Sequence, residues 1–454
     1  MKVDLLVRDC RVVKPDGVVR CTLAIRDSVV VAVVDPDEDM AAHRRIDAEG
    51  RYVLPGLLDT HVHLGVGTQS FASQCLTESR HAVVGGVTTL FVYALTRGAY
   101  ADVLPDMRRA ACAQGLVDMV FHVIITREDQ IAEIPRLAEE FGVRSFKAFM
   151  AYKGREASPS GIQGMGDGEI FATFQQVAWV PGGIGIVHCE NMEIIEFHQK
   201  PFIQANRQDT AAWSDSRPVF GELEAIRRMI ALAEAAGIHL LVPHMGIGLG
   251  SEFLRQKAWG RARVSAETCP HYLLFDKGED RGVAGKVNPP LRDRQQIEGL
   301  WQRLVDGTID VVGSDHCPFT RDSKGAELWS ARAGIPGGSA MILPVLLSEG
   351  VHRRGLPLQK VVELTSYRAA RLFGLYPRKG ALEVGSDADL AILDLDREVE
   401  VGVETLHSAA DFTPYAGYRA RGWVEITISR GRVVYEKGEI VGEGPPGRVL
   451  LARG

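Results

Sequence analysis

The sequence contains no apolar run long enough to span a bilayer, and its cysteines form no CxxC pair. A membrane-spanning helix needs roughly 20 mostly apolar residues, so we expect no membrane-embedded segment. The seven cysteines are odd in number and scattered, which excludes a small disulfide-stapled fold and favours a reducing cytoplasm. The N-terminal stretch includes Asp4 among apolar residues and resembles neither a signal peptide nor a transit peptide.

An excess of positive charge is also lacking, because the formal net charge is −6. This balance gives no reason to expect nucleic acid or an anionic membrane as a partner, so a small molecule is the expected ligand. With 454 residues, of which 46% are hydrophobic and 24% charged, the chain can bury a large core and has the composition of a globular protein.

Both ends of the chain are rich in residues that favour β-strands. Residues 3–47 alternate between apolar and polar side chains in short segments separated by turns, and residues 390–395 and 424–435 repeat this style. Each end alone offers few strands and little core. We therefore expect two segments, 1–53 and 380–454, to pack together as one small antiparallel β-sandwich domain.

Between these ends, strand-like runs alternate with helical patterns, which is typical of parallel βαβ units. Eight such runs are predicted, at residues 57–63, 88–94, 118–125, 144–150, 183–188, 239–244, 262–267 and 309–315. One of the helices is marked by Ile226, Met229, Ile230 and Ala233 at helical spacing, with Gly237 as its C-cap. Residues 54–379 are thus predicted to form an α/β fold, a (β/α)8 TIM barrel.

A pair of histidines ends the first predicted strand, in the motif PGLLDTHVH at residues 55–63. Side chains two positions apart on a strand point to the same face, so His61 and His63 form a potential chelating pair. Two ordinary core or surface histidines are the alternative, since an HxH motif alone is weak. In a TIM barrel the active site lies at the C-terminal ends of the strands, which is where this pair stands.

Other residues of metal-ligand type occupy the same place in the pattern. The candidates that end or lie within predicted strands are His61, His63, Lys147, His188, His244 and Asp315. Four imidazoles and a carboxylate suit divalent transition metals such as zinc. Lys147 does not, because a protonated ammonium cannot bind a cation, and a salt-bridged or snorkelling lysine is the alternative for it. His122, in the third strand, is interpreted as a core histidine.

Six motifs together resemble the cyclic-amide branch of the amidohydrolase superfamily, which includes hydantoinase or dihydropyrimidinase, allantoinase and dihydroorotase. They are PGLLDTHVH (55–63), SFKAFMAYK (145–153), VHCEN (187–191), ETCPHY (267–272), NPPLR (288–292) and GSDHC (313–317). The resemblance extends through VGSDADL (384–390) and so covers nearly the whole chain.

This resemblance implies a binuclear metal centre, with zinc as the expected metal. Lys147 would carry a carboxylate on its side-chain nitrogen and bridge the two ions, with His61, His63 and Asp315 on one ion and His188 and His244 on the other. The centre would open a cyclic amide C–N bond by attack of a metal-bridging hydroxide. Asp315 would accept the proton and return it to the leaving nitrogen, while Tyr152 would donate a hydrogen bond to the oxyanion.

The choice among family members rests on fewer residues. Leu64 follows the HxH motif where dihydroorotases have a carboxylate-binding arginine, and Tyr152 is usually lacking in allantoinases, so both residues favour a hydantoinase. Asn288 instead matches dihydroorotases, and Ala333 stands where hydantoinases have a substrate-binding asparagine. Tyr152, Asn288 and Leu64 are the predicted substrate contacts. Allantoinase, dihydroorotase and a non-catalytic assembly protein remain the alternatives.

Some further expectations concern the surroundings of the site. Two flexible segments, 64–71 and 154–168, are expected to cover the pocket. The glycine-rich run 246–251 is interpreted as a strand-to-helix connection rather than a phosphate-binding nest. Cys189 and Cys317 are interpreted as packing residues. The resemblance also suggests a homodimer or homotetramer, in contact through the C-terminal β unit.

Overall fold

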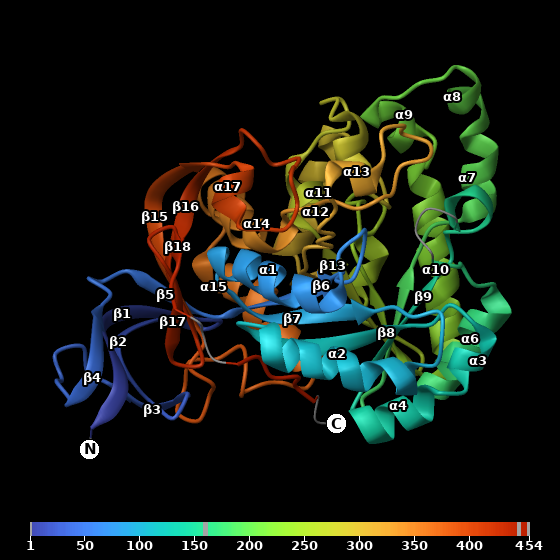
Figure 1. The fold of residues 1–454 in the computed structure, drawn as a ribbon. Helices are drawn as coiled ribbons and strands as arrows, with labels where there is room; N and C mark the ends of the chain where they lie inside the picture. The colour runs from blue at the N-terminus through green and yellow to red at the C-terminus, as the bar shows by residue number, and fades with distance from the viewer. Residues whose placement is uncertain (1, 158–161, 443–445, 452–454) are drawn as a thin grey trace.

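Two nine-stranded sheets organise the chain in the computed structural model, which describes residues 2–157, 162–442 and 446–451. One sheet forms the barrel and the other is made by both chain ends (Figure 1). In the part of the chain that is described, no helix has both the length and the apolar character needed to cross a membrane.

The barrel strands are parallel and follow one another in sequence order. They are β6 (Leu57–Val62), β7 (Val87–Ala94), β8 (Asp118–Ile124), β9 (Ser145–Phe149), β10 (Ile184–His188), β11 (His239–Val242), β13 (Ala262–Thr268) and β14 (Val311–Val312). A short strand, β12 (Ala258–Trp259), adds to β13 in the antiparallel direction. A parallel bridge between Val62 and His316 closes the ring between its first and last strands. The predicted (β/α)8 barrel is therefore confirmed.

Helices surround the barrel strands. Those of the first half are α1 (Phe71–Val84), α2 (Tyr100–Gln114), α3 (Glu128–Ile131), α4 (Ile134–Phe141), η1 (Gly154–Glu156) and α6 (Asp167–Val177). Those of the second half are α7 (Met192–His198), α8 (Lys200–Gln204), α9 (Thr210–Asp215), α10 (Val219–Ala236), η2 (Glu252–Arg255), α11 (Pro270–Leu274), η3 (Gly282–Gly285), α12 (Arg294–Val305), α13 (Arg321–Lys324), α14 (Gly338–Val345), η4 (Leu346–His352), α15 (Leu358–Val362), η5 (Glu363–Tyr367) and α16 (Arg368–Leu372).

Helix α10 shows how the sequence dictates a local element. Ile226, Met229, Ile230 and Ala233 are buried along one face of it, as the helical spacing predicts. Gly237 ends the helix with a φ of 74°, a left-handed conformation that glycine adopts without the penalty of a Cβ. The turn leads directly into β11, which carries the chain toward His244.

The second sheet brings the two chain ends together. Its strands are β1 (Val3–Lys14), β2 (Gly17–Arg26), β3 (Val29–Val34), β4 (Ala42–Asp47), β5 (Tyr52–Pro55), β15 (Leu390–Glu400), β16 (Arg419–Ser429), β17 (Arg432–Glu436) and β18 (Glu439–Ile440), with the short helix α17 (Val403–Leu406) between β15 and β16. The ends join where β5 pairs with β15, and side chains of both share one core, as predicted. The N-terminal unit is not purely antiparallel, however, because β1 pairs in parallel with β4 and β5.

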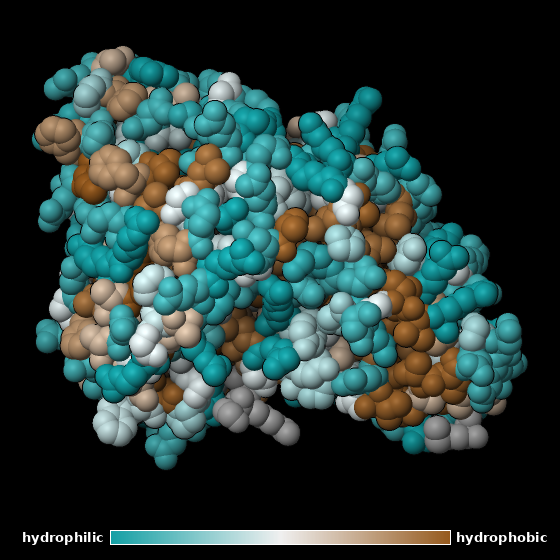
Figure 2. Space-filling model, turned by 180° about the vertical axis from the view of Figure 1, so that it is seen from behind, coloured by the Kyte–Doolittle hydropathy of each residue, from teal (hydrophilic) through white to brown (hydrophobic). Residues whose placement is uncertain are grey.

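The surface of the chain-end sheet keeps several apolar side chains in contact with solvent. Val18 and Val19 of β2 and Val33 of β3 are among the exposed large hydrophobic residues. Seen from behind, apolar residues gather at the lower right, on the side that this sheet occupies (Figure 2).

Candidate functional site

The structure brings the six predicted ligand residues to the carboxyl end of the barrel. His61 lies in β6, Lys147 in β9, and His188 is the last residue of β10. His63, His244 and Asp315 follow their strands by one to three residues, in the connections that leave β6, β11 and β14. All six side chains are buried except that of His63, which is 14% exposed.

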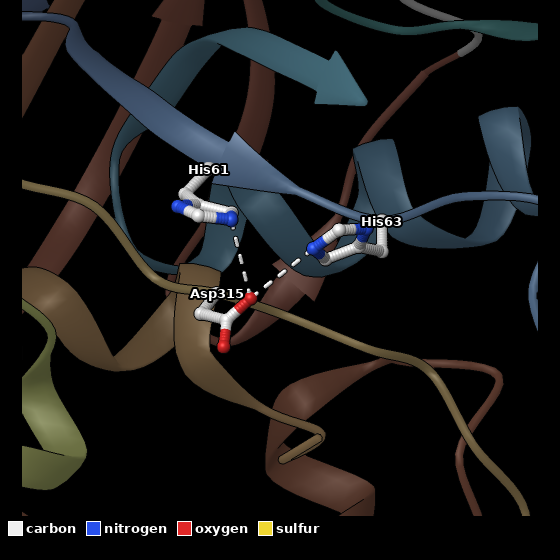
Figure 3. A group of neighbouring side chains, drawn as sticks. All are labelled: His61, His63 and Asp315. Carbon is white, nitrogen blue, oxygen red and sulfur yellow. Dashed lines mark ion pairs between the residues drawn. The ribbon is translucent and has the colours of Figure 1, made fainter. Parts of the chain in front are cut away.

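Three of these residues form a compact group around one carboxylate. The Nε2 atoms of His61 and His63 lie 3.3 and 3.2 Å from the same oxygen, Oδ1 of Asp315. Figure 3 shows both imidazoles pointing toward this carboxylate from one strand and its continuation. One ligand atom from each residue lies within 4.8 Å of the others, which is close enough for a single metal ion to be bound by all three.

The other three residues form an adjacent group. Nε2 of His244 lies 3.1 Å from Nδ1 of His188 and 3.3 Å from Nζ of Lys147. The ring centroids of His61 and His244 are 5.1 Å apart, so the two groups share one site. Convergent imidazole nitrogens are suitable ligands for a cation.

Buried carboxylates hold two of the histidines from behind. Oε1 of Glu267 lies 2.7 Å from Nδ1 of His61, and Oε2 of Glu190 lies 2.7 Å from Nε2 of His188. Each carboxylate fixes a proton on the nitrogen that it faces, so the opposite nitrogen presents its lone pair to the site. Sequence reasoning did not assign these roles. Two features of the sequence could have indicated them: Glu190 lies two residues after His188, and Glu267 ends a predicted strand.

The donor set fits a pair of divalent cations. Nε2 of His61 and Nδ1 of His244 are buried without a hydrogen-bond partner among the described residues. A buried polar atom without a partner is costly in a folded protein, and metal coordination would satisfy Nε2 of His61, whereas His244 faces the site through its other nitrogen, Nε2. Imidazole and carboxylate ligands of this kind are typical of zinc and related transition metals.

Lys147 lies in surroundings where a charged ammonium is expensive. Its Nζ lies 4.9 Å from the ring of Tyr93 and 5.0 Å from that of Phe149, and burial lowers its pKa to about 8. Among the described residues no carboxylate forms an ion pair with it, so the salt-bridged alternative is not observed. A lysine with a lowered pKa is partly neutral near physiological pH and is therefore nucleophilic.

Three candidate site residues have left-handed backbone conformations, which are rare for residues other than glycine. The φ angles are 61° for Tyr152, 39° for His244 and 48° for Asp315. Such conformations cost of order 1–3 kcal/mol and persist only where the surrounding structure enforces them. The packing around the cavity therefore holds these three residues in place.

Five of the six metal-ligand candidates, all except His61, line a cavity of about 470 Å³. All three predicted substrate contacts, Tyr152, Asn288 and Leu64, also line it. The hydroxyl of Tyr152 accepts a long hydrogen bond of 3.5 Å from Nδ2 of Asn288, and burial raises the pKa of Tyr152 well above its usual value. Tyr152 therefore stays protonated and can donate a hydrogen bond to a bound molecule.

The cavity also has an apolar wall, one residue of which, Phe149, lies beside Lys147. Its apolar side chains are Leu64, Val66, Phe71, Leu95, Val103, Met107, Phe149, Ile162 and Phe319. Most residues of the predicted covering segment 64–71 line the cavity. Of the second segment, 154–168, residues 158–161 lie outside the described part of the chain, while Ile162 lines the cavity. The contributions of Val103 and Met107, which project from α2, were not predicted.

The structure also locates Ala333 and His122, two residues discussed from the sequence. Arg332, Ala333 and Gly334 line the cavity where the asparagine is lacking, and Nη1 of Arg332 donates to the Ser323 carbonyl. His122 is buried and packs against Phe91, Tyr93 and Phe373, as a core histidine does.

The cysteines and the glycine-rich run behave as structural features. Cys189 and Cys317 are buried, and burial raises the pKa of both thiols, which disfavours a thiolate nucleophile. The backbone amides of Gly248 and Leu249 donate to Oε1 of Gln296 and are therefore not free to bind a phosphate.

This barrel and its cluster of histidines, lysine and aspartate are of a kind found in hydrolases, and the chain belongs to the amidohydrolase family, which it matches over residues 52–434. The chain is 34% identical to the L-hydantoinase of Paenarthrobacter aurescens, with 99% of this chain and 98% of that protein covered. It is 37% identical to the allantoinase of Rubrobacter xylanophilus, with 98% and 97% covered.

Solved structures agree with these relatives. The D-hydantoinase from Bacillus sp. AR9 superimposes with a TM-score of 0.90 at 30% identity, and the alignment covers 99% of each chain. The resemblance to the cyclic-amide branch of the family, drawn from six motifs, is therefore confirmed.

Proposed function

We propose that the protein hydrolyses the ring C–N bond of a cyclic ureide or imide of the hydantoin or dihydropyrimidine type. The observation that carries this proposal is the convergence of His61, His63, Asp315, Lys147, His188 and His244 at one end of a 470 Å³ cavity. The similarity along the whole chain to an L-hydantoinase and to a D-hydantoinase supports the same reaction class.

The metal centre of this proposal consists of two divalent cations, with zinc as the preferred ion. His61, His63 and Asp315 would hold one ion, His188 and His244 the other, and a carboxylated Lys147 would bridge them. Such a pair supplies a hydroxide nucleophile near neutral pH and polarises the substrate carbonyl. No ion pair forms at Lys147 among the residues that the structure describes, and its pKa is lowered; both support carboxylation, because an uncharged amine reacts with carbon dioxide.

Three side chains would transfer the proton, stabilise the oxyanion and orient the substrate. Asp315, whose Oδ1 lies next to two imidazoles, would accept the proton of the attacking hydroxide and return it to the ring nitrogen that leaves. The protonated Tyr152 would donate a hydrogen bond to the oxygen on which negative charge develops. Asn288, 3.5 Å from the Tyr152 hydroxyl, would orient the ring amide beside it.

The apolar wall favours a ring that carries an apolar substituent. Phe71, Val103 and Met107 would contact such a group, whereas the polar ureido group of allantoin would lose hydrogen bonds to water there. Allantoin remains the second candidate substrate, because identity to an allantoinase is 37%.

The decisive experiment offers hydantoin, phenylhydantoin, dihydrouracil, allantoin and dihydroorotate to the purified protein, with bound metal measured on the same sample. We expect ring opening of a hydantoin with an apolar substituent and about two metals per chain. A matched variant, Lys147→Arg, keeps a positive charge but cannot be carboxylated, and should lose metal and activity together. A fully active Lys147→Arg variant would falsify the bridging role of Lys147.

Two further expectations complete the proposal. We propose that the protein forms a homodimer or homotetramer in contact through its C-terminal β unit. Light scattering coupled to gel filtration tests this assembly, and a monomer at micromolar concentration would contradict it. The cytoplasmic location stays a prediction from the sequence.

A further inference from the structure

A buried arginine lies behind the site and contacts two carboxylates at once. Arg217, immediately before Pro218 and helix α10, has a side chain that is only 1% exposed. Its Nη1 donates to Oε1 of Glu190 at 3.1 Å, and its Nη2 donates to Oε1 of Glu156. The guanidinium also lies over the ring of Trp213, 4.3 Å from the centroid. No part of the function proposed above assigns Arg217 a role.

The first carboxylate leads to a metal-ligand candidate. Glu190 uses one oxygen for Arg217 and the other for Nε2 of His188, which is 2.7 Å away. Because Nε2 of His188 is engaged in this way, Nδ1 is the nitrogen that points toward His244. Arg217 thus fixes the orientation of the Glu190 carboxylate that orients His188.

The second carboxylate belongs to the segment that carries the predicted oxyanion donor. Glu156 ends the short turn η1 (Gly154–Glu156), four residues after Tyr152. Tyr152 has a left-handed backbone with a φ of 61°, and its ring packs edge-on against His188 at 5.4 Å between centroids. A firm contact at Glu156 limits how far this strained segment can relax.

Arg217 is itself held by its neighbours. Nη1 of Arg292 donates to the backbone carbonyl of Arg217, and Nη2 of Arg292 pairs with Glu222 at 2.8 Å. Glu222 in turn accepts a hydrogen bond from the backbone amide of Gly246, two residues after His244. The backbone from which the Arg217 side chain extends is therefore held in place.

We propose that Arg217 is a positioning residue that sets the His188 imidazole through Glu190 and the Tyr152 segment through Glu156. The inference rests on the functions proposed above for His188 as a metal ligand and for Tyr152 as an oxyanion donor. A planar guanidinium has five N–H donors in a fixed fork and can serve two carboxylates simultaneously, whereas an ammonium is a compact point charge. Without Arg217, two buried carboxylates would repel each other beside the metal centre.

The test compares four single variants in the full-length protein. Each is prepared metal-free and then titrated with zinc in the presence of bicarbonate, and its steady-state kinetics are measured on the best hydantoin substrate. The variants are Arg217→Lys, Glu190→Gln, Glu156→Gln and, as a matched control, Arg430→Lys. Arg430 is 4% exposed and pairs with the buried Asp118 at 3.2 Å, away from the cavity residues.

The two carboxylate variants are expected to separate the effect on His188, which binds metal, from the effect on the Tyr152 segment. Glu190→Gln should weaken zinc binding by roughly 10–100-fold, as is typical when the partner of a metal-bound histidine is lost. Glu156→Gln should keep wild-type zinc affinity and lower kcat by about tenfold with little change in KM, because only the Tyr152 segment is released. Arg217→Lys should show both defects, and Arg430→Lys neither, even if both lower Tm.

The outcomes distinguish this inference from the proposed function. If the wild-type protein binds zinc and opens hydantoins while Arg217→Lys matches it in zinc affinity and kcat, the positioning role is wrong and the function stands. If Arg217→Lys does not fold, the comparison of zinc affinity between Glu190→Gln and Glu156→Gln still tests the inference. Equal effects of both variants on zinc affinity would overturn it. A wild-type protein that binds no zinc would overturn the proposed function itself.

Discussion

Tyr152 combines an unfavourable backbone with a side chain aimed into the cavity. Its φ of 61° is sustained by the packing of its ring against Phe149 and His188. Tyr152→Phe keeps this packing and removes only the hydroxyl. We expect kcat to fall by about 10²–10³-fold with metal content unchanged, as is typical when one oxyanion donor is lost. Steady-state kinetics with metal analysis test this, with Tyr376→Phe, outside the cavity, as the control. An unchanged kcat would exclude the donor role.

His81 provides a pH-dependent contribution to stability at the residue scale. It is fully buried, with Nδ1 2.6 Å from the Leu406 carbonyl and Nε2 accepting from the Ala340 amide, an arrangement that suits a neutral imidazole. Burial lowers the pKa of His81 from 6.5 to about 3. Between these two values the unfolded chain binds one more proton at this position than the folded chain does. The free energy of unfolding should therefore fall as pH falls through this window, by up to about 1.4 kcal/mol per pH unit.

Urea unfolding between pH 6.5 and 4 measures this contribution. His81→Gln removes the titrating group, so its free energy of unfolding, although lower overall, should depend on pH less steeply than that of the wild type. Equal slopes for the two proteins would contradict the assignment.

At the scale of elements, the connection after β11 is shaped by a close backbone crossing. A Cβ on Gly248 would overlap the backbone of Gly299 and Leu300 in α12, where Gly248 now lies against the helix. We expect Gly248→Ala to lower the free energy of unfolding by at least about 2 kcal/mol, because backbone cannot move aside as a side chain can. Gly168→Ala in α6, which meets nothing within 4 Å, is the control and should be neutral or stabilising. Comparable Tm values for the two variants would show that the crossing is not tight.

The positions of helices and strands were largely predictable where the apolar pattern extends over many residues. The spacing of Ile226, Met229, Ile230 and Ala233 identified α10 and its glycine cap, and seven barrel strands lie within a few residues of their predicted ranges. The eighth strand was predicted over residues 309–315, but β14 covers only Val311–Val312. Three residues after this strand Asp315 takes a left-handed conformation, which period-2 patterns cannot predict. The parallel pairing of β1 with β4 and β5 was missed because alternation specifies a strand and not its partner.

At the scale of the whole molecule, one lysine ties the barrel to the chain-end domain. Nζ of Lys379 lies 2.7 Å from Asp118 in β8, and 3.0 and 2.5 Å from Asp387 and Asp389, which precede β15. Lys379→Met would leave three buried carboxylates without the ammonium that neutralises them. We expect it to lower the free energy of unfolding by about 3–5 kcal/mol. Denaturant unfolding measures it, with Lys277→Met, whose ion pair with Asp215 is partly exposed, as a control expected to cost about 0–1 kcal/mol. Equal losses would show that the cluster does not link the domains.

The sequence by itself determined the barrel, the union of the two chain ends and the family, because these depend on local periodicity and on motifs whose residues are adjacent in the chain. It also nominated all six side chains that converge at the barrel mouth, although their metal-binding roles stay predictions. Only the tertiary structure decided which carboxylate backs which histidine, which helix closes the cavity wall, and that Arg217 joins Glu156 to Glu190. Glu190 and His188 are only two positions apart, but the Arg217 contacts and the Glu267–His61 contact join residues from 27 to 206 positions apart. The pairing of these distant residues follows from how helices and loops pack onto the barrel, which no local pattern encodes.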